Sequence, residues 1–561
     1  MSTSSSSPAW EIQLLFGPAQ QPLSYLQAVW LETKSTVNQV PSGKIVLSAP
    51  GGTSADLKAL SDEAKQCQPG TQVVIKVKSS QSQDVLFSGI VQQQSYSVQM
   101  GRSELTLKVR HPLQKLVATH RSQLFEQMSD KQVLQQLLQD HDIAQGKSLS
   151  GLEIEHPQMV QFDCSDWQFI KARLNANGVW LLPEVDGGVS IKPPKLSTAE
   201  ADHTLHQSQA MARPGEAEPM IVDACWQYNG LEQPGKLAVS AWDLKQQDMS
   251  PNTQATSCNL GSDGLDPGRF AMPDQQQWLL TSTLSLIQDE AKAWADSRYL
   301  ALQAKGLQAS FTLAGNAAYQ LGQTLGLSGF GTHFNGNGLI SSVQHKFSRG
   351  NWRTVLMLGQ DTFNDLDEPL LPSVAGLLVG IVEDYEEDPD SLNRLRVKVP
   401  AVGNKSLWAR FAMPYASKNS GLCLYPEPKD EVVLGFFAQD PRYPVILGSM
   451  HNPENTAPFA PSQANNKKGL VFVKDDNTRQ LLFDTQEGSL LLQYDKDQLQ
   501  FKSGIELSAD QDMQLSAANV KVNATKNTTL TSDEKIDLST KKLSATGNDS
   551  VKVKGQAIEL G

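Results

Sequence analysis

The last 60 residues of the chain, 502–561, constrain its fold more than any other segment. They contain no Phe, Tyr, Trp, Pro, Cys or Arg, and only 14 of them are Val, Ile, Leu or Met. These few apolar residues are evenly spaced, because eight apolar-x-apolar triplets begin 8, 7, 8, 8, 7, 8 and 7 residues apart. The triplets are Ile505/Leu507, Met513/Leu515, Val520/Val522, Thr528/Leu530, Ile536/Leu538, Leu543/Ala545, Val551/Val553 and Ile558/Leu560, with Thr528 and Ala545 as the weak members.

Each triplet fits a minimal strand that carries two side chains on one face. A fixed short period predicts a β-helix or a prism-like solenoid. So few bulky side chains cannot enclose a dry core within one chain, whereas three chains around a common axis can share one. We therefore predict a homotrimeric, triple-stranded β-helix, although the composition alone would also suit a disordered tail. The predicted core residues of this needle are Ile505, Leu507, Met513, Leu515, Val520, Val522, Ile536, Leu538, Val551 and Val553.

The rest of the chain has the composition of folded domains. All ten Trp residues precede residue 409, and a chain of 561 residues is long enough for several domains. The longest apolar run, 375–382, has eight residues, whereas a membrane-spanning helix needs about 20. The net charge of -12 and the sequence pI near 5.3 disfavour nucleic acid and anionic lipid as partners.

The N-terminus and the cysteines indicate synthesis in a reducing compartment. Residues 1–10 are Ser-rich and lack the basic and apolar regions of a secretory signal. The five cysteines are scattered, without a C-x-x-C pair, which predicts buried free thiols.

Before residue 360 the sequence predicts strands interrupted by helices. The first 100 residues contain β-rich segments, such as 45–47 and 73–77, and 105–109 continues this pattern. Ser129 with Gln132, and Ser165 with Gln168, have the spacing of capping boxes, and they predict helices ending at Gly146 and Gly178. A buried strand at 179–182, a longer helix at 284–305 and further strands at 339–358 follow.

The region after residue 372 predicts a small barrel. Residues 361–372 are acidic and contain Pro, as expected of a linker. Five short apolar segments then follow within about 75 residues, which is typical of a small closed barrel. The predicted strands are 377–382, 395–399, 407–411, 431–437 and 445–447.

These segments resemble the spike proteins of contractile injection machines, which are the VgrG proteins of type VI secretion and the equivalent spikes of phage-tail-like extracellular particles. The resemblance rests on 165–174 with Gly178, on 339–347 with 352–354, and in the barrel on 379–382, 390–399, 408–410, Pro426, 430–432, 435–436 and 440–448. Residues 475–485 with the tail resemble the entry to the triple-stranded β-helix of that family.

The resemblance implies a mainly β fold with some α, made of four parts. They are a hub-like, tube-docking domain of β-barrel type with helices (1–372), an OB-fold barrel (373–453), a linker (454–469) and a β-helix needle (470–561). It implies a structural, non-enzymatic homotrimer at the tip of an injection machine, without a cofactor or metal. Its implied partners are the inner tube protein, baseplate proteins, the target cell envelope and a PAAR-type tip protein, which would contact Ile558, Leu560 and Gly561.

The same resemblance implies a protein made in the cytoplasm without a signal peptide and released outside the cell within a phage tail-like particle. We expect no effector domain after Gly561 and no lysozyme domain in the short linker, which favours an extracellular particle slightly over type VI secretion. A trimeric β-helical tailspike that acts on envelope polysaccharide is the alternative, but the tail lacks aromatic residues for stacking on sugars. An adhesin stalk would need a secretory signal and a head domain.

Three local patterns are candidate sites of chemistry. His203 and His206 form an H-x-x-H without a further ligand nearby, so a surface loop is favoured over a metal site. Ser328 lies in a Gly-rich stretch, but Phe330 stands where a nucleophile elbow needs Gly. Six carboxylates fall within 383–390; a solvated loop is favoured over a Ca²⁺ site or a glycosidase pair.

Overall fold

The computed structural model describes residues 10–49, 54–78, 82–99, 102–196, 200–210, 220–270, 277–348, 350–359 and 369–559. The chain divides into two compact units, Met1–Thr456 and Ala457–Gly561. The predicted linker at 361–372 lies largely outside the described residues. Below, "hub" denotes the part of the first unit that precedes the barrel, residues 10–372.

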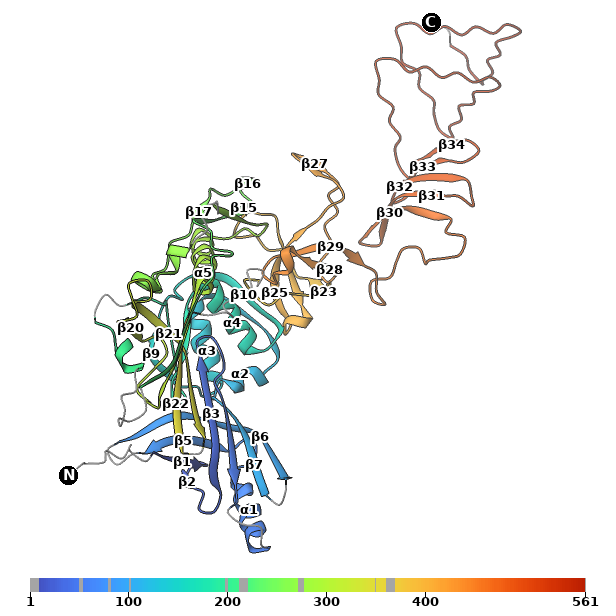
Figure 1. Cartoon of the computed structure of the whole chain (residues 1–561). Helices are drawn as coiled ribbons and strands as arrows, with labels where there is room; N and C mark the ends of the chain where they lie inside the picture. Colours follow the sequence, from blue (N-terminus) through green and yellow to red (C-terminus); the bar gives the residue numbers. More distant parts are fainter. Residues whose placement is uncertain are drawn as a thin grey trace, which may run out of the picture. The chain divides into compact units, whose positions relative to one another are not determined.

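A thirteen-stranded sheet forms the largest part of the hub in the described residues (Figure 1). Its order is β14-β19-β22-β21-β3-β4-β7-β6-β5-β1-β2, with β20 paired to β21 and β13 paired in parallel to β20. The strands are β1 (Glu11–Phe16), β2 (Gln21–Pro22), β3 (Gln27–Thr36), β4 (Ser42–Ser48), β5 (Gln72–Lys78), β6 (Gln83–Gln99), β7 (Arg102–Arg110), β13 (His203–His206), β14 (Ile221–Tyr228), β19 (Leu307–Ala314), β20 (Thr324–Ser328), β21 (Gly336–Ser348) and β22 (Asn351–Leu358).

Helices and smaller sheets complete the hub, and Figure 1 shows α3, α4 and α5 grouped between the long strands and the barrel. The helices are α1 (Ser54–Gln66), α2 (Gln114–Ala118), α3 (Asp130–Asp140), α4 (Asp166–Asn177) and α5 (Gln288–Gly306). One small sheet pairs β8 (Arg121–Ser129) with β10 (Glu155–Cys164). In a second sheet, β12 (Val189–Lys192) lies between β9 (Gln145–Leu149) and β11 (Trp180–Pro183). In a third sheet, β15 (Leu237–Asp243) pairs with β16 (Asp248–Met249), β17 (Thr253–Gln254) and β18 (Trp278–Ser282).

Both predicted capping boxes are confirmed. The hydroxyl of Ser129 accepts from the Gln132 backbone N–H, and Ser165 does the same with Gln168. Gly178 adopts the left-handed conformation, with φ 63°, that ends α4. A glycine suits this position because an L side chain there is strained.

Two sequence predictions about the hub helices are wrong. The helix at 130 ends at Asp140 rather than at Gly146, because residues 145–149 pair as strand β9. The first 100 residues were expected to form strands only, but they include α1. This helix packs on the sheet through Leu60, with the following Cys67 beside it, and no Ser/Thr-x-x-Glu/Gln box marks its start in the sequence.

The predicted small barrel is confirmed as a closed five-stranded barrel in the order β23-β24-β25-β29-β28. Its strands are β23 (Leu378–Val382), β24 (Leu395–Val399), β25 (Lys405–Phe411), β28 (Glu431–Phe436) and β29 (Pro444–Met450), and the hairpin β26 (Ala416–Ser417) and β27 (Ser420–Gly421) leaves it between β25 and β28. Val160 of β10 belongs to the same buried cluster as the barrel core residues Val397, Leu407 and Leu434. A hub strand therefore contributes to the barrel core.

The second unit begins with an antiparallel meander. Its strands are β30 (Lys467–Lys474), β31 (Asn477–Asp484), β32 (Ser489–Tyr494), β33 (Asp497–Phe501) and β34 (Ile505–Ser508). From 509 to 559 the described single chain has no helix or strand. Within the described residues, the predicted triplets from Met513/Leu515 to Val551/Val553 therefore have no strand partner in this chain.

Two further expectations can be compared with the described residues. None of the helices in this part of the chain is long and apolar enough to cross a membrane. The cysteine prediction is only partly right: Cys67 and Cys164 are buried and Cys258 is half-buried, but Cys225 and Cys423 are exposed.

Candidate functional site

The meander of the second unit has one apolar face. Cross-strand partners in a sheet point to the same side, and the pairing aligns Leu481 with Leu492 and Phe483 with Leu490. The pairing extends these two rows across all five strands, and Lys468 is the β30 member of the row that contains Phe483. The apolar members of the two rows are Leu470, Leu481, Phe483, Leu490, Leu492, Leu499, Phe501, Ile505 and Leu507. We call this set the apolar sheet face.

The opposite face of the same meander is richer in polar side chains, although Leu482 and Leu491 form a cross-strand pair on it. Gln480 and Gln493 form a cross-strand pair, and the Gln493 carbonyl oxygen accepts from the Gln480 side-chain amide at 2.7 Å. Gln498 and Glu506 lie on this face too. The sheet is therefore amphipathic, which is the pattern of a sheet that packs on one side only.

The apolar sheet face is exposed in the single chain. Leu492 is 53% and Ile505 is 68% exposed. Contiguous exposed apolar area of this kind marks an interaction surface in a soluble protein.

The predicted needle residues divide into three groups. Ile505 and Leu507 lie in β34 and belong to the apolar sheet face. The next nine residues lie in the stretch without regular structure, and all are between 51% and 75% exposed: Met513, Leu515, Val520, Val522, Ile536, Leu538, Val551, Val553 and Ile558. The remaining two predicted tip-contact residues, Leu560 and Gly561, lie outside the described residues.

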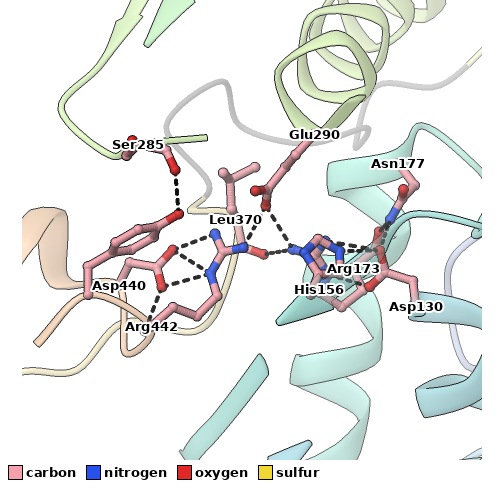
Figure 2. Close-up of polar contacts among 10 residues, drawn as sticks. Asp130, His156, Arg173, Asn177, Ser285, Glu290, Leu370, Asp440 and Arg442 are labelled. Atoms are coloured by element: carbon pink, nitrogen blue, oxygen red, sulfur yellow. Dashed lines mark hydrogen bonds and ion pairs between the residues drawn. The ribbon is translucent and has the colours of Figure 1, made fainter. Parts of the chain in front are cut away.

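A row of buried charged side chains connects the hub to the barrel. We call it the hub–barrel joint: Asp130, Arg173, Glu290, Asp440 and Arg442 (Figure 2). None of the five is more than 6% exposed. Burying charges is costly unless each is paired and hydrogen-bonded, so the partners of each group decide what the joint contributes.

On the hub side, Arg173 of α4 holds Asp130 at the start of α3. Its Nε and Nη2 donate to the two carboxylate oxygens at 2.6 and 3.0 Å, which is a bidentate pairing. The Asn177 amide also donates to Asp130, at 2.9 Å, and the third guanidinium nitrogen, Nη1, donates to the Leu370 carbonyl at 3.0 Å. The Asp130–Arg173 pair thus holds together two helices and the segment that precedes the barrel.

On the barrel side, Arg442 pairs with Asp440 in the turn between β28 and β29. Its Nε and Nη2 donate to Asp440 at 3.1 and 2.8 Å. Its Nη1 donates to Glu290 of α5 at 2.6 Å, and the same Glu290 oxygen lies 3.9 Å from Arg173 Nη1. Figure 2 shows Glu290 between the two guanidinium groups.

Uncharged contacts support the joint. The Tyr443 hydroxyl donates to the Ser285 carbonyl at 2.9 Å, just before α5. The Gln158 amide of β10 donates to the Arg442 carbonyl at 2.8 Å. Hub and barrel are therefore tied through several elements.

The charges of Asp130 and Arg442 are stabilised by their partners in the joint. Burial would raise the pKa of Asp130, but the charge of Arg173 and the hydrogen bonds from His156 and Arg173 outweigh it and hold this pKa well below its usual value. Burial would lower the pKa of Arg442, but Asp440 and Glu290 raise it well above its usual value.

Sequence reasoning did not identify the joint. Arg442 and Asp440 lie in the segment that resembles spike barrels, but Glu290 is 152 residues away from Arg442 and Asp130 is 43 residues away from Arg173. No local spacing links such partners. Two acids in the first turn of the predicted helix, Asp289 and Glu290, are a local signal, but they equally fit a helix dipole.

The acidic segment 383–390 is organised by arginines. Asp388 accepts from Arg394 Nη2 at 2.6 Å and from the backbone N–H groups of Asp390 and Leu392. Burial raises the pKa of Asp388, but these hydrogen bonds outweigh it and lower this pKa overall. In the described residues, no group of three or more His, Cys, Asp and Glu could hold a metal ion.

The H-x-x-H pattern and the Gly-rich stretch around Ser328 fall on neighbouring strands. His203 and His206 form the ends of β13, so the predicted surface loop is wrong; the chain here is a short strand paired with β20. His203 Nε2 lies 3.0 Å from the Gln323 amide oxygen. Ser328 is the exposed last residue of β20, and Gly329 turns the chain after it with φ 80°.

Comparisons with known proteins agree with this architecture. Residues 18–349, more than half of the chain, match the family model of the Alg8 N-terminal domain. Residues 378–451 match the type VI secretion system/phage-baseplate injector OB domain. The second match covers the five strands of the barrel.

Individual relatives are spike proteins. The spike protein VgrG1a of Pseudomonas aeruginosa is 38% identical over 56 residues, which are 10% of this chain and 9% of the relative. VgrG3 of Vibrio cholerae is 28% identical over 142 residues, 24% of this chain and 14% of the relative. The chain thus matches only about a tenth of the length of these curated relatives.

A chain of the lidded Francisella PdpA–VgrG complex has the same fold over most of its length. Its TM-score is 0.58 at 11% identity, with 89% of this chain and 80% of that chain covered. The protein therefore belongs to the Alg8 N-terminal domain family and is a VgrG-like spike protein.

Proposed function

We propose that three copies of this chain form the spike and hub at the tip of a contractile injection machine. The hub docks on the inner tube and the baseplate, the barrels form a neck, and the needle punctures the target envelope. A PAAR-type cone seats on the needle end at Ile558, Leu560 and Gly561. The function is mechanical, requires no cofactor and involves no nucleic acid.

One observation carries the proposal, namely the exposed apolar sheet face that leads into the periodic tail. A five-stranded amphipathic sheet needs a covering partner, and three such sheets can cover one another around a common axis. Ile505 and Leu507 belong both to this face and to the first triplet. The shared interior would therefore continue along Met513, Val520 and the later triplets.

The proposed needle gains stiffness from closed strand pairing. In a three-chain helix each strand finds neighbours in the other copies, so no edge stays unpaired. The polar outer side, represented by Gln480 and Gln498, keeps the needle soluble. The hub–barrel joint would pass an axial load from the hub into the neck without a flexible hinge.

The oligomeric state tests the proposal. We expect light scattering of the full chain to give the mass of three copies. Leu492→Asp places a charge on the apolar sheet face and should shift the protein to monomers, because three like charges would be buried together. Gln498→Asp adds the same charge on the polar face and should leave the trimer intact. A folded monomer of the unaltered chain in dilute buffer would overturn the proposal.

The localisation follows from the same proposal: the spike is made in the cytoplasm and leaves the cell within a phage tail-like particle. A β-helical tailspike acting on polysaccharide is the second candidate, since it would share the trimer. Release of reducing ends from envelope polysaccharide by the purified protein would favour it. Electron microscopy of the spike at the end of a tube would favour the injection machine.

A further inference from the structure

An exposed arm projects from the barrel. Residues 412–425 leave after β25 and return before β28, and every residue from Pro414 to Tyr425 is exposed. Figure 1 shows β27 at the end of this projection. The arm nevertheless carries large apolar side chains: Tyr415, which is 56% exposed, Leu422, Leu424 and Tyr425.

The arm has little to hold it within its own chain. β26 and β27 pair through two residues each, and the Leu422 N–H donates to the Tyr415 carbonyl at 3.0 Å. A two-stranded hairpin of this size is marginal on its own in water. An exposed hairpin with four large apolar side chains is therefore a surface that lacks its partner.

The same barrel has a second apolar surface on the outside of β23, β28 and β29. Val379 pairs with Val433, and Val433 pairs with Gly448, so these three residues form one outward row. Leu447, which is 51% exposed, Leu377 and Met450 are exposed beside it. We call this surface the barrel wall.

The charges of the two surfaces are complementary. The arm contains one charged residue, Lys418, at its tip, and no acid. β23 of the wall runs directly into the acidic segment that begins at Glu383, where Asp384, Glu386 and Glu387 are exposed. An arm lying along the wall can bring its cation to this acidic loop.

Two complementary patches at different places on one subunit produce a head-to-tail contact, and such contacts close into a ring when the rotation permits. The meander that leads into the proposed three-chain needle starts at Lys467, 17 residues after Met450. A link of this length spans at most about 60 Å. Joined needles would therefore hold the barrels at high local concentration, where a weak contact is sufficient.

We infer that the arm of each copy docks on the barrel wall of the next copy, so that three arm–wall contacts close the neck of the spike. This inference rests on the proposed trimer and adds the surfaces and the direction of contact. It assigns Tyr415, Leu422 and Leu424 to one side, and Val379 and Leu447 to the other.

Thiol cross-linking tests the inference, because Cys423 already lies in the arm. Burial raises the pKa of the Cys67 thiol to about 12 and that of Cys258 to about 11, so these thiols react slowly. In a Cys225→Ser background, Leu447→Cys provides the wall thiol. We expect a short bismaleimide to give covalent dimers and trimers on denaturing gels.

Mixed chains labelled with ¹⁴N and ¹⁵N identify the linked copies. Mass spectrometry should find the bond between Cys423 of one copy and the thiol at position 447 of another. Val222→Cys, at an exposed hub position, is the matched control and should give no covalent dimers or trimers with Cys423. The link should disappear when Cys423→Ser is added.

The outcomes separate the two proposals. A trimer by light scattering that gives no link between copies overturns the arm–wall contact and leaves the proposed function standing. A link only within one chain overturns it too, because the arm would then cover its own barrel. A monomer by light scattering overturns both proposals.

Discussion

Arg442 Nη1 lies 2.6 Å from Glu290 Oε1, and this contact joins a turn of the barrel to the first turn of α5 across 152 residues of sequence. Glu290 also faces Arg173 at 3.9 Å. One buried carboxylate is thus shared by the barrel and by the helical part of the hub. A barrel that merely followed the hub through a linker would have no need of such a contact.

Removing Arg442 should destabilise the first unit strongly. Arg442→Met leaves Glu290 and Asp440 buried without their main cation, and breaking a buried pair from one side costs about 3–5 kcal/mol. We expect a lower urea midpoint and faster hydrogen exchange in the first turn of α5. Arg396→Met is the control, because the Arg396 side chain is 33% exposed and forms ion pairs near the surface. This substitution should lower the free energy of unfolding by about 1 kcal/mol or less. Equal losses in the two variants would contradict a special role for the joint.

The sequence was most informative where the deciding contacts are local. The boxes at Ser129 and Ser165 each join residues three positions apart, and the barrel strands alternate within five to seven residues, so both were predictable. The joint was not, because a pair such as Arg442 and Glu290 comes together only when the fold is complete. Helix α1 was missed because its start lacks the Ser/Thr-x-x-Glu/Gln box that marks α3 and α4.

Gly178 provides a test of a local prediction that also depends on packing. It has φ 63°, and a Cβ there would lie 3.1 Å from the backbone Cα of Ser297 in α5. Gly178→Ala should therefore lower the free energy of unfolding by about 1–2 kcal/mol, because an L residue is strained in the left-handed conformation. Displacing α5 to make room for the Cβ should lower it further. Gly488→Ala is a matched control, with φ 62° and no atom within 4 Å. The thermal midpoint should fall further for the first variant, and equal shifts would show that the contact with α5 is unimportant.

The stability of the hub should depend on pH because His345 and His111 are buried in it. Burial lowers the pKa of His345 from 6.5 to about 4, and that of His111 likewise. Between these values the unfolded chain binds a proton that the folded chain does not. Their contribution is therefore complete above about pH 6.5 and decreases as the pH falls to about 4, by up to about 1.4 kcal/mol per pH unit for each histidine.

Replacing one histidine should make this dependence shallower. His345→Gln keeps a polar partner for Thr354, whose hydroxyl lies 3.0 Å from His345 Nδ1. We expect the unfolding free energy of this variant to change less between pH 6.5 and 4, as measured by urea titrations. The exposed His451→Gln should retain the slope of the unaltered protein. An unchanged slope in His345→Gln would contradict the assignment. The low pKa of Asp130 adds a further loss only below its unfolded value near 3.8.

The needle shows a different limit of sequence reasoning. The period of the triplets predicts a strand at each one, yet the single chain has none in its described residues 509–559. A strand with two apolar side chains gains stability only when its edges and its apolar face are covered. For Val520 or Val553 we propose that other copies supply this cover, so one chain alone does not display it.

A charge near the end of the needle tests this explanation. Val553→Asp should place three like charges close to the proposed common axis, and burying such unpaired charges costs several kcal/mol. Ser550→Asp adds the same charge three residues earlier, outside the apolar triplets, and should be tolerated. For Val553→Asp only, we expect the mass measured by light scattering to fall below that of three copies. The thermal unfolding midpoint of the trimer should drop for this variant only, too. If the heat resistance of the Val553→Asp trimer is unchanged, residue 553 does not lie in a shared core, and the periodic tail needs another explanation.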